Sequence, residues 1–192
     1  MAGLPERALT IPNLLSILRI LFAPMLVVAA ASGQARLFLF LFILSLASDA
    51  LDGFLARRLG QVSEWGAQLD SWGDLATYLA APIGAWLLWP SLVRREQPFI
   101  LLGLAGFLLP IFLGFCKFGR LTSYHTRAAR IAAILLGLAT PLLLVGGPPY
   151  PFRLAMLIFL LAEVEEVAIT LRLKRWRANI PSFRHCCRLP PE

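Results

Sequence analysis

Long apolar runs alternate with short polar segments along almost the whole chain. Such runs cover 14–31, 37–59, 66–89, 99–118, 131–145 and 154–173. As helices rising about 1.5 Å per residue, runs of this kind can cross a bilayer core of about 30 Å. A backbone in lipid must satisfy its own hydrogen bonds, so the spans should be helical. The pattern predicts an all-α, polytopic membrane protein with six transmembrane helices.

The ends of the chain fit the same plan. Residues 1–10 mix apolar and charged side chains, which predicts a short interfacial helix before the first span. The first apolar run is too long for a signal peptide and lacks a cleavage pattern, so it should stay as a span. Residues 174–192 form a basic tail that we expect to contact the lipid surface. We interpret 1–192 as a single membrane domain.

Composition and charge support a membrane protein and give its orientation. The sequence is 58 % hydrophobic and 15 % charged, with a net charge of +7. Its basic residues cluster at span ends and do not form a groove, which argues against nucleic-acid binding. Most of the 18 basic residues lie on the side that both termini share. The positive-inside rule therefore places both termini, and the turn between the second and third spans, in the cytoplasm.

Four aspartates interrupt this apolar chain around the turn between the second and third spans. Asp49 and Asp52 are three residues apart, and Asp70 and Asp74 are four apart, so each pair shares one helix face. The polar segment 57–65 between them should form a turn that brings all four carboxylates together. Gathered carboxylates repel each other in a low dielectric unless they bind a cation or keep a proton. A divalent metal site is the leading interpretation.

The neighbouring residue types indicate what such a metal would hold. Carboxylate oxygens suit Mg²⁺ or Mn²⁺. Gly53 and Ala56 leave the face of Asp49 and Asp52 free of bulk, and Arg57 can bind an anionic oxygen. These features are typical of a diphosphate site at the cytoplasmic end of the bilayer. Phosphoryl or phosphatidyl transfer there needs a base, and Asp74 is our candidate because it lies deepest on its span.

The spacing of these residues resembles the signature of one family. Asp49-x₂-Asp52-Gly53-x₂-Ala56-Arg57-x₈-Gly66-x₃-Asp70-x₃-Asp74 is similar at every fixed position to the signature of the CDP-alcohol phosphatidyltransferases. Residues 11–19 also resemble the entry into the first span of many members. The resemblance implies a metal-dependent phospholipid synthase that displaces CMP from a CDP-lipid, usually CDP-diacylglycerol, with an alcohol. It also implies a homodimer.

The resemblance further implies roles for single residues. Asp49, Asp52, Asp70 and Asp74 would bind the metals, with Asp74 also the base. Gly53, Ala56, Arg57 and Gly66 would line the cytidine and diphosphate pocket. Basic residues around the fourth and fifth spans are candidates for binding a phosphate on the acceptor, although the positive-inside rule alone would also place them there; they are Lys117, Arg120, Arg127 and Arg130.

The acceptor alcohol stays open. Members that use glycerol phosphate often read Asp-Pro-x-Ala-Asp-Lys around the last two aspartates, whereas this chain reads Asp-Ser-Trp-Gly-Asp-Leu from Asp70 to Leu75. Residues 74–82 look somewhat more like members that use serine or choline. Glycerol phosphate, serine, inositol phosphate and choline therefore remain candidates.

Other interpretations concern the charged residues inside the spans. Intramembrane carboxylates could instead belong to a cation or proton transporter, or the protein could be a non-catalytic scaffold. Arg19 in the first span is predicted either to pair with Glu163 and Glu166 of the sixth span or to snorkel to the interface. Cys116, Cys186 and Cys187 suggest no disulfide framework and are interpreted as reduced thiols.

Overall fold

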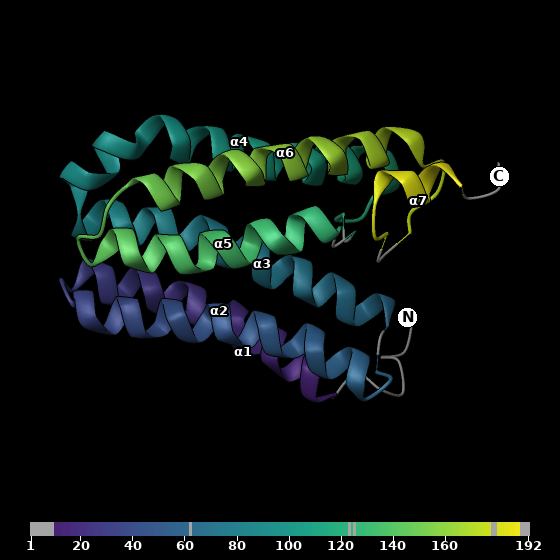
Figure 1. Ribbon diagram of the computed structural model, residues 1–192. Helices are drawn as coiled ribbons and strands as arrows, with labels where there is room; N and C mark the ends of the chain where they lie inside the picture. The colour runs from purple at the N-terminus through teal and green to yellow at the C-terminus, as the bar shows by residue number, and fades with distance from the viewer. Residues whose placement is uncertain (1–9, 62, 123, 125, 178–179, 189–192) are drawn as a thin grey trace. The chain divides into compact units, whose positions relative to one another are not determined.

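The computed structural model describes residues 10–61, 63–122, 124, 126–177 and 180–188. These residues form seven helices, which confirms the all-α prediction (Figure 1). The chain divides into two compact units, Met1–Pro90 and Ser91–Glu192. The interfacial helix predicted for 1–10 lies almost entirely outside the described residues.

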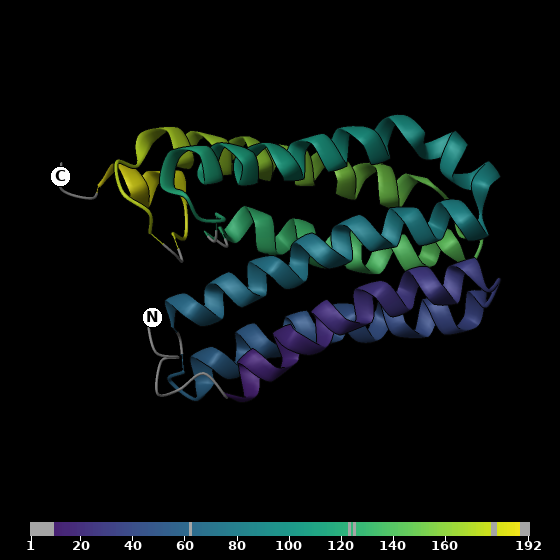
Figure 2. The same cartoon turned by 180° about the vertical axis from the view of Figure 1, so that it is seen from behind.

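The first unit consists of three long helices, α1 (Ile11–Ala31), α2 (Ala35–Arg58) and α3 (Glu64–Leu88). Helix α1 lies beside both α2 and α3 (Figure 2). Thr10 caps α1 by accepting a hydrogen bond from the Asn13 amide, and Ser63 caps α3 in the same way through the Gly66 amide. Gly60 has a φ of 63°, a conformation that favours glycine, and it ends α2. These caps set the turn that returns α3 alongside α1.

A glycine allows α2 and α3 to approach each other closely. A Cβ atom built on Gly84 of α3 would lie 2.2 Å from Cε2 of Phe38 on α2. Phe38 is fully buried, stacks on Phe42 and meets the edge of Trp89. The Phe38 ring therefore cannot move away from a Cβ atom at position 84.

We expect Gly84→Ala to destabilise the protein by about 1 to 3 kcal/mol, the usual cost of overpacking a filled core. Thermal unfolding of the detergent-solubilised protein would measure the loss. In the double variant Gly84→Ala/Phe38→Leu the added methyl has space, so the two effects should not add. Unchanged stability in Gly84→Ala would contradict this packing.

The second unit contains α4 (Pro90–Phe118, whose first residue belongs to the first unit), α5 (Arg127–Leu144), α6 (Tyr150–Arg172) and the short α7 (Phe183–Cys187). Small residues let α4 approach α6. A Cβ on Gly103 would lie 2.4 Å from Sδ of Met156, and one on Gly106 would lie 2.8 Å from a methyl of Leu160. Helix α5 begins at Arg127, four residues before the apolar run predicted from residue 131.

Helix α4 differs from its prediction. The sequence predicted a connection over 90–98 and a span from 99, but the helix begins at Pro90 and continues through Pro98 and Pro110. Proline is tolerated at the first position of a helix. Glu96, in the segment expected to be a connection, is fully buried, and its carboxylate accepts hydrogen bonds from Nε of Arg95 (2.9 Å) and Nε of Arg153 (2.8 Å). This pairing joins the first turns of α4 to α6.

The buried carboxylate of Glu96 is stabilised by its hydrogen bonds to Arg95 and Arg153. In Arg153→Met the carboxylate would lose two of its hydrogen bonds, so we expect a loss of about 2 kcal/mol of stability. Thermal unfolding would again report it. Arg36→Met, which removes an exposed arginine from α2, is the control and should leave the melting temperature unchanged. Equal melting temperatures for the two variants would show that the Glu96–Arg153 pair does not stabilise the protein.

Four helices are long and apolar enough to cross a membrane: Ile11–Ala31, Ala35–Ala56 within α2, Pro90–Phe118 and Arg127–Leu144. Large apolar side chains on α1, including Leu21 and Val28, are more than half exposed, as a lipid-facing surface requires. Helices α3, which carries Asp70 and Asp74, and α6, which carries Glu163, Glu165 and Glu166, are not among these four helices within the described residues. The structure therefore supports an integral membrane protein, and six spans remain a prediction.

Candidate functional site

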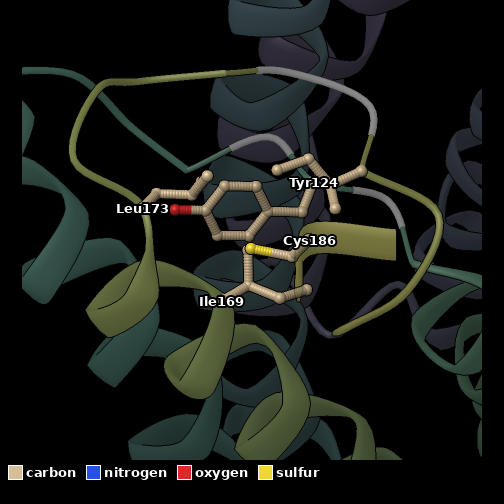
Figure 3. Close-up of a cluster of buried hydrophobic side chains, with 5 residues drawn as sticks. Tyr124, Ile169, Leu173 and Cys186 are labelled. Carbon is tan, nitrogen blue, oxygen red and sulfur yellow. The ribbon is translucent and has the colours of Figure 1, made fainter. Parts of the chain in front are cut away.

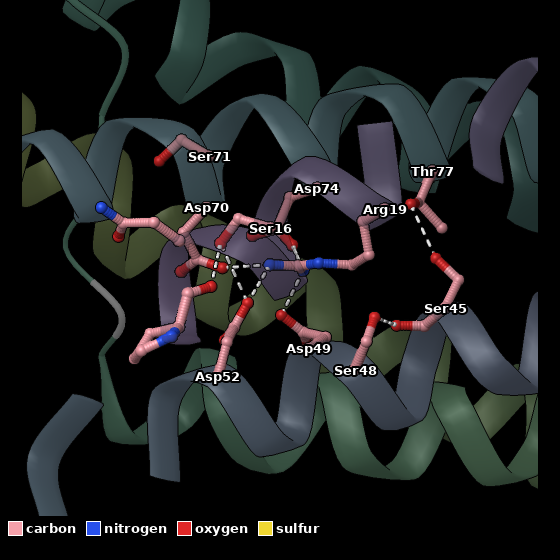
Figure 4. Close-up of polar contacts among 12 residues, drawn as sticks. Ser16, Arg19, Ser45, Ser48, Asp49, Asp52, Asp70, Ser71, Asp74 and Thr77 are labelled. Carbon is pink, nitrogen blue, oxygen red and sulfur yellow. Dashed lines mark hydrogen bonds and ion pairs between the residues drawn. The ribbon is translucent and has the colours of Figure 1, made fainter. Parts of the chain in front are cut away.

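The four aspartates of the signature converge on a single side chain, Arg19 of α1 (Figure 4). Asp49 and Asp52 come from α2, and Asp70 and Asp74 come from α3. Helical spacing places each pair on one face, and α1 lies beside both helices. The predicted convergence of the carboxylates is confirmed.

The guanidinium of Arg19 donates to all four carboxylates. Its Nη1 atom bonds Asp49 and, at 2.7 Å, Oδ1 of Asp74. Its Nη2 atom bonds Asp70 and, at 2.6 Å, Oδ2 of Asp52. The Arg19 side chain is only 2 % exposed, so these pairs lie in a low dielectric, where charge-assisted hydrogen bonds are strong.

The carboxylates differ in how far they reach solvent. The Asp52 side chain is 5 % exposed, and Oγ of Ser16 also donates to it at 3.1 Å. The side chains of Asp49, Asp70 and Asp74 are 37 %, 20 % and 26 % exposed. The cluster is thus closed on the Asp52 side and open on the side of the other three.

Small and hydroxylated residues surround the cluster. A Cβ on Gly73 of α3 would lie 3.3 Å from Nε of Arg19, so this glycine leaves room for the guanidinium. The hydroxyls of Ser45 on α2 and Thr77 on α3 lie 3.2 Å apart and link the two helices near the aspartates. These contacts fix the helices that carry the carboxylates.

The donor set suits a hard divalent cation. Carboxylate oxygens of Asp49, Asp70 and Asp74 lie within 4.8 Å of one another, and Asp52 is outside this group of three. An all-oxygen, anionic set fits Mg²⁺ or Mn²⁺ better than thiophilic metals. Arg19 shows independently that this position attracts positive charge. The residues therefore fit the predicted metal site.

The residues predicted to bind the nucleotide lie next to the aspartates in sequence. Gly53 and Ala56 are partly buried on α2. Arg57 belongs to α2, and only its backbone is described by the structure. Gly66 faces α1, where a Cβ atom would lie 2.8 Å from Oδ1 of Asn13. The role of these four residues in binding a nucleotide stays a prediction.

The residues predicted to bind the acceptor lie in the second unit around the α4–α5 connection, 119–126. Lys117 donates to the carbonyls of Thr170 and Leu171 at the end of α6. Arg120 lies over the ring of Trp176 at 5.4 Å, and Arg127 and Arg130 are exposed at the start of α5. Lys117 and Arg120 thus combine these contacts with exposure to solvent, as all four basic residues are exposed.

The tail after α6 packs against the α4–α5 connection. Ile180 and Cys186 are buried against Tyr124, Ile169 and Leu173 (Figure 3). Nε1 of Trp176 donates to the Leu121 carbonyl at 2.8 Å, and the Arg127 amide donates to the Pro181 carbonyl. The tail was expected to contact lipid, but its apolar side chains contact protein.

Burial raises the pKa of two residues in this apolar cluster of the second unit, Tyr124 and Cys186. It raises the pKa of Tyr124 to about 12, so the phenol stays neutral at physiological pH while Thr170 donates to it at 3.1 Å. Burial also raises the pKa of the Cys186 thiol. The cysteines are free, as predicted, and this buried one is not a reactive thiolate.

Sequence reasoning missed the role of Arg19. It predicted that Arg19 would pair with Glu163 and Glu166 or snorkel, and both predictions are wrong because the side chain is buried and bonded to the aspartates. Glu163 is instead buried in the second unit beside Gly106. The charges of the first two spans could have indicated this role. Arg19 is the only basic residue within their apolar part, so it is the natural partner of the nearby aspartates.

Residues 9–171 match the CDP-alcohol phosphatidyltransferase family. The chain belongs to this family of transferases, which confirms the resemblance seen in its signature.

The relatives have related activities. The chain is 33 % identical to a CDP-diacylglycerol–serine O-phosphatidyltransferase of Methanocaldococcus jannaschii, over 62 % of this chain and 67 % of the relative. It is 31 % identical to a CDP-diacylglycerol–glycerol-3-phosphate 3-phosphatidyltransferase of Cereibacter sphaeroides, over 69 % and 65 %. A cardiolipin synthase (CMP-forming) of Streptomyces coelicolor is 36 % identical over 54 % and 53 %. The matches thus span about two thirds of the first two relatives and half of the third. No solved structure matches the chain.

Proposed function

We propose that this protein is a phospholipid synthase that transfers a phosphatidyl group from a CDP-lipid, with CDP-diacylglycerol the first candidate, to the hydroxyl of an alcohol and releases CMP. The observation that carries the proposal is the convergence of all four signature aspartates at one point, within the part of the chain that matches the family. The names of the relatives support CDP-diacylglycerol as the donor.

The aspartates would hold Mg²⁺ or Mn²⁺. Asp49, Asp70 and Asp74 have the closest oxygens, and Asp52 completes the set that the signature implies. When bound, a divalent ion would neutralise the diphosphate and stabilise the departing CMP. Gly53, Ala56, Arg57 and Gly66 would accommodate the cytidine and diphosphate, because the first two leave the α2 face free of bulk.

Asp74 would be the base. Its carboxylate, on the more open side of the cluster, would take the proton of the acceptor hydroxyl. The hydroxyl oxygen then forms a bond to the phosphorus attached to the lipid, and the bond from that phosphorus to the bridging oxygen breaks. CMP leaves with the electron pair of that bond. The exposure of Asp74 supports this role, since an acceptor must reach it.

The finer features of the proposal concern orientation, assembly and acceptor. The distribution of basic residues supports cytoplasmic termini and an active site that opens to the cytoplasm. A homodimer is expected from family membership. All four basic residues around the α4–α5 connection are exposed and are candidates to bind a phosphate on the acceptor; they are Lys117, Arg120, Arg127 and Arg130.

The test is release of CMP from CDP-diacylglycerol by the purified protein with Mg²⁺ or Mn²⁺. The acceptors to compare are glycerol 3-phosphate, serine, inositol, inositol phosphate, choline and phosphatidylglycerol. Metal-dependent release with one of them, abolished by EDTA, is the expected result. No release with any acceptor, together with no binding of the CDP-lipid, would overturn the proposal.

A further inference from the structure

We propose that Arg19 is the resident cation of the aspartate cluster, and that a divalent metal ion must displace its guanidinium from Asp49, Asp70 and Asp74 in order to bind. This inference rests on the metal site of the proposed function. Arg19 would occupy the carboxylates before metal binds, and this competition would lower the affinity of the site for metal.

A single guanidinium binds four carboxylates. The two terminal nitrogens of an arginine carry four N–H bonds, and each nitrogen here bonds two carboxylates, one from α2 and one from α3. Arginine cannot lose its charge in a protein. It therefore offsets part of the repulsion among four carboxylates and holds α2 and α3 together when no metal is bound.

The guanidinium and the metal would use the same side chains. The oxygens near enough to share an ion belong to Asp49, Asp70 and Asp74, and each of these aspartates is also paired with Arg19. A divalent cation among these oxygens would lie next to the positive guanidinium, and the two like charges would repel each other. The two cations therefore compete for the three carboxylates.

Arg19 is held mainly through its terminal nitrogens. Its Nε atom is buried and has no hydrogen-bond partner within the described part of the chain. This nitrogen faces Gly73, whose missing side chain leaves the space that the guanidinium uses. An unsatisfied buried donor has a cost, so the attraction of the carboxylates determines this position. A more highly charged ion can weaken that attraction.

Asp52 gives the displaced arginine a remaining partner. It lies outside the group of three, it is the most buried of the four carboxylates, and Ser16 also bonds it. Arg19 can keep its Nη2 bond to Asp52 while it releases the other three. Metal binding thus needs a movement at the end of one side chain and no rearrangement of the helices.

The inference is tested by titrating Mn²⁺ into the metal-free full-length protein in detergent micelles and following free Mn²⁺ by electron paramagnetic resonance. If Arg19 competes with the metal, Arg19→Met should bind Mn²⁺ more tightly by about tenfold or more, because a neighbouring positive charge is gone. The metal-free form of this variant should also melt at a lower temperature than the wild type. Arg19→Lys, which keeps the charge, is the matched control and should bind Mn²⁺ close to the wild-type affinity.

The outcomes separate this inference from the proposed function. Equal or weaker Mn²⁺ binding by Arg19→Met would overturn the competition and make Arg19 a support of the ligands, while the metal site would stand. No Mn²⁺ binding by the wild type or by either variant would overturn the metal site and the proposed function as well.

A measurement on the wild type covers the case in which Arg19→Met does not fold. In protein labelled with ¹⁵N-arginine, Mg²⁺ should shift the Nε–H resonance of Arg19, which is assigned by its loss in Arg19→Lys. An unchanged resonance at saturating Mg²⁺ would overturn the displacement.

Discussion

Replacing Asp74 by asparagine should lower the rate of CMP release about a thousandfold while the protein still binds CDP-diacylglycerol. Asparagine has nearly the same shape as aspartate but cannot accept a proton from the acceptor hydroxyl, and a positioned base contributes about 10²- to 10⁴-fold to such a rate. Steady-state CMP release and equilibrium binding of the CDP-lipid, measured on the same preparation, would check this.

Asp74 is also a predicted metal ligand, so a second variant is needed to separate the two roles. Asp49→Asn should weaken metal binding, and higher Mg²⁺ should restore part of its rate. The same Mg²⁺ should not restore Asp74→Asn, because the missing proton acceptor is not replaced by metal. Equal losses of lipid binding and of rate in Asp74→Asn, or full rescue by Mg²⁺, would count against Asp74 as the base.

Gly53→Leu should prevent binding of the nucleotide part of the donor. Gly53 follows Asp52 directly on α2, and a leucine there would fill the face that the diphosphate is expected to approach. Steric conflict of this kind costs about 1 to 3 kcal/mol, so the affinity for the CDP-lipid should fall by up to about a hundredfold. Equilibrium binding of CDP-diacylglycerol is the direct measurement.

The control places the same side chain elsewhere on the helix. Ala47 is exposed on α2, and Ala47→Leu should leave the affinity unchanged. If Gly53→Leu binds the CDP-lipid as the wild type does, the nucleotide does not lie on this face. Thermal unfolding of both variants would show whether a loss of binding follows from a loss of fold.

The convergence of the aspartates was predictable because it depends on local rules. Residues three or four apart share a helix face, and Gly60 and Ser63 supply the end of α2 and the cap of α3 around a short polar turn. Two such faces joined by a tight turn point toward each other, and α1, which packs against both helices, completes the convergence.

The position of Arg19 was not predictable in this way. It lies 30 residues from Asp49 and 55 from Asp74 in sequence, and the contact depends on how α1 docks against both helices. The space for its guanidinium comes from Gly73, which is not part of the signature. An intramembrane arginine has several possible partners, and only packing selects among them.

The start of α4 and the packing of the tail were missed for the same physical reason. Glu96 made the segment 90–98 look like a loop, but its partner Arg153 is 57 residues away. The tail looked like a lipid contact because it is basic, yet Ile180 and Cys186 fit a site formed by residues of two distant segments. The start of α4 and the packing of the tail both depend on contacts between residues far apart in the sequence, which composition does not reveal.

The packing of residues 180–186 on the α4–α5 connection also constrains when the second unit can finish folding during synthesis. Tyr124 and Leu121 are translated and inserted well before the residues that cover them. The connection must wait until residues 180–186 have left the ribosome. The nascent protein therefore exposes this connection, with Arg120 and Arg127 at its edges, until residues 180–186 can pack on it.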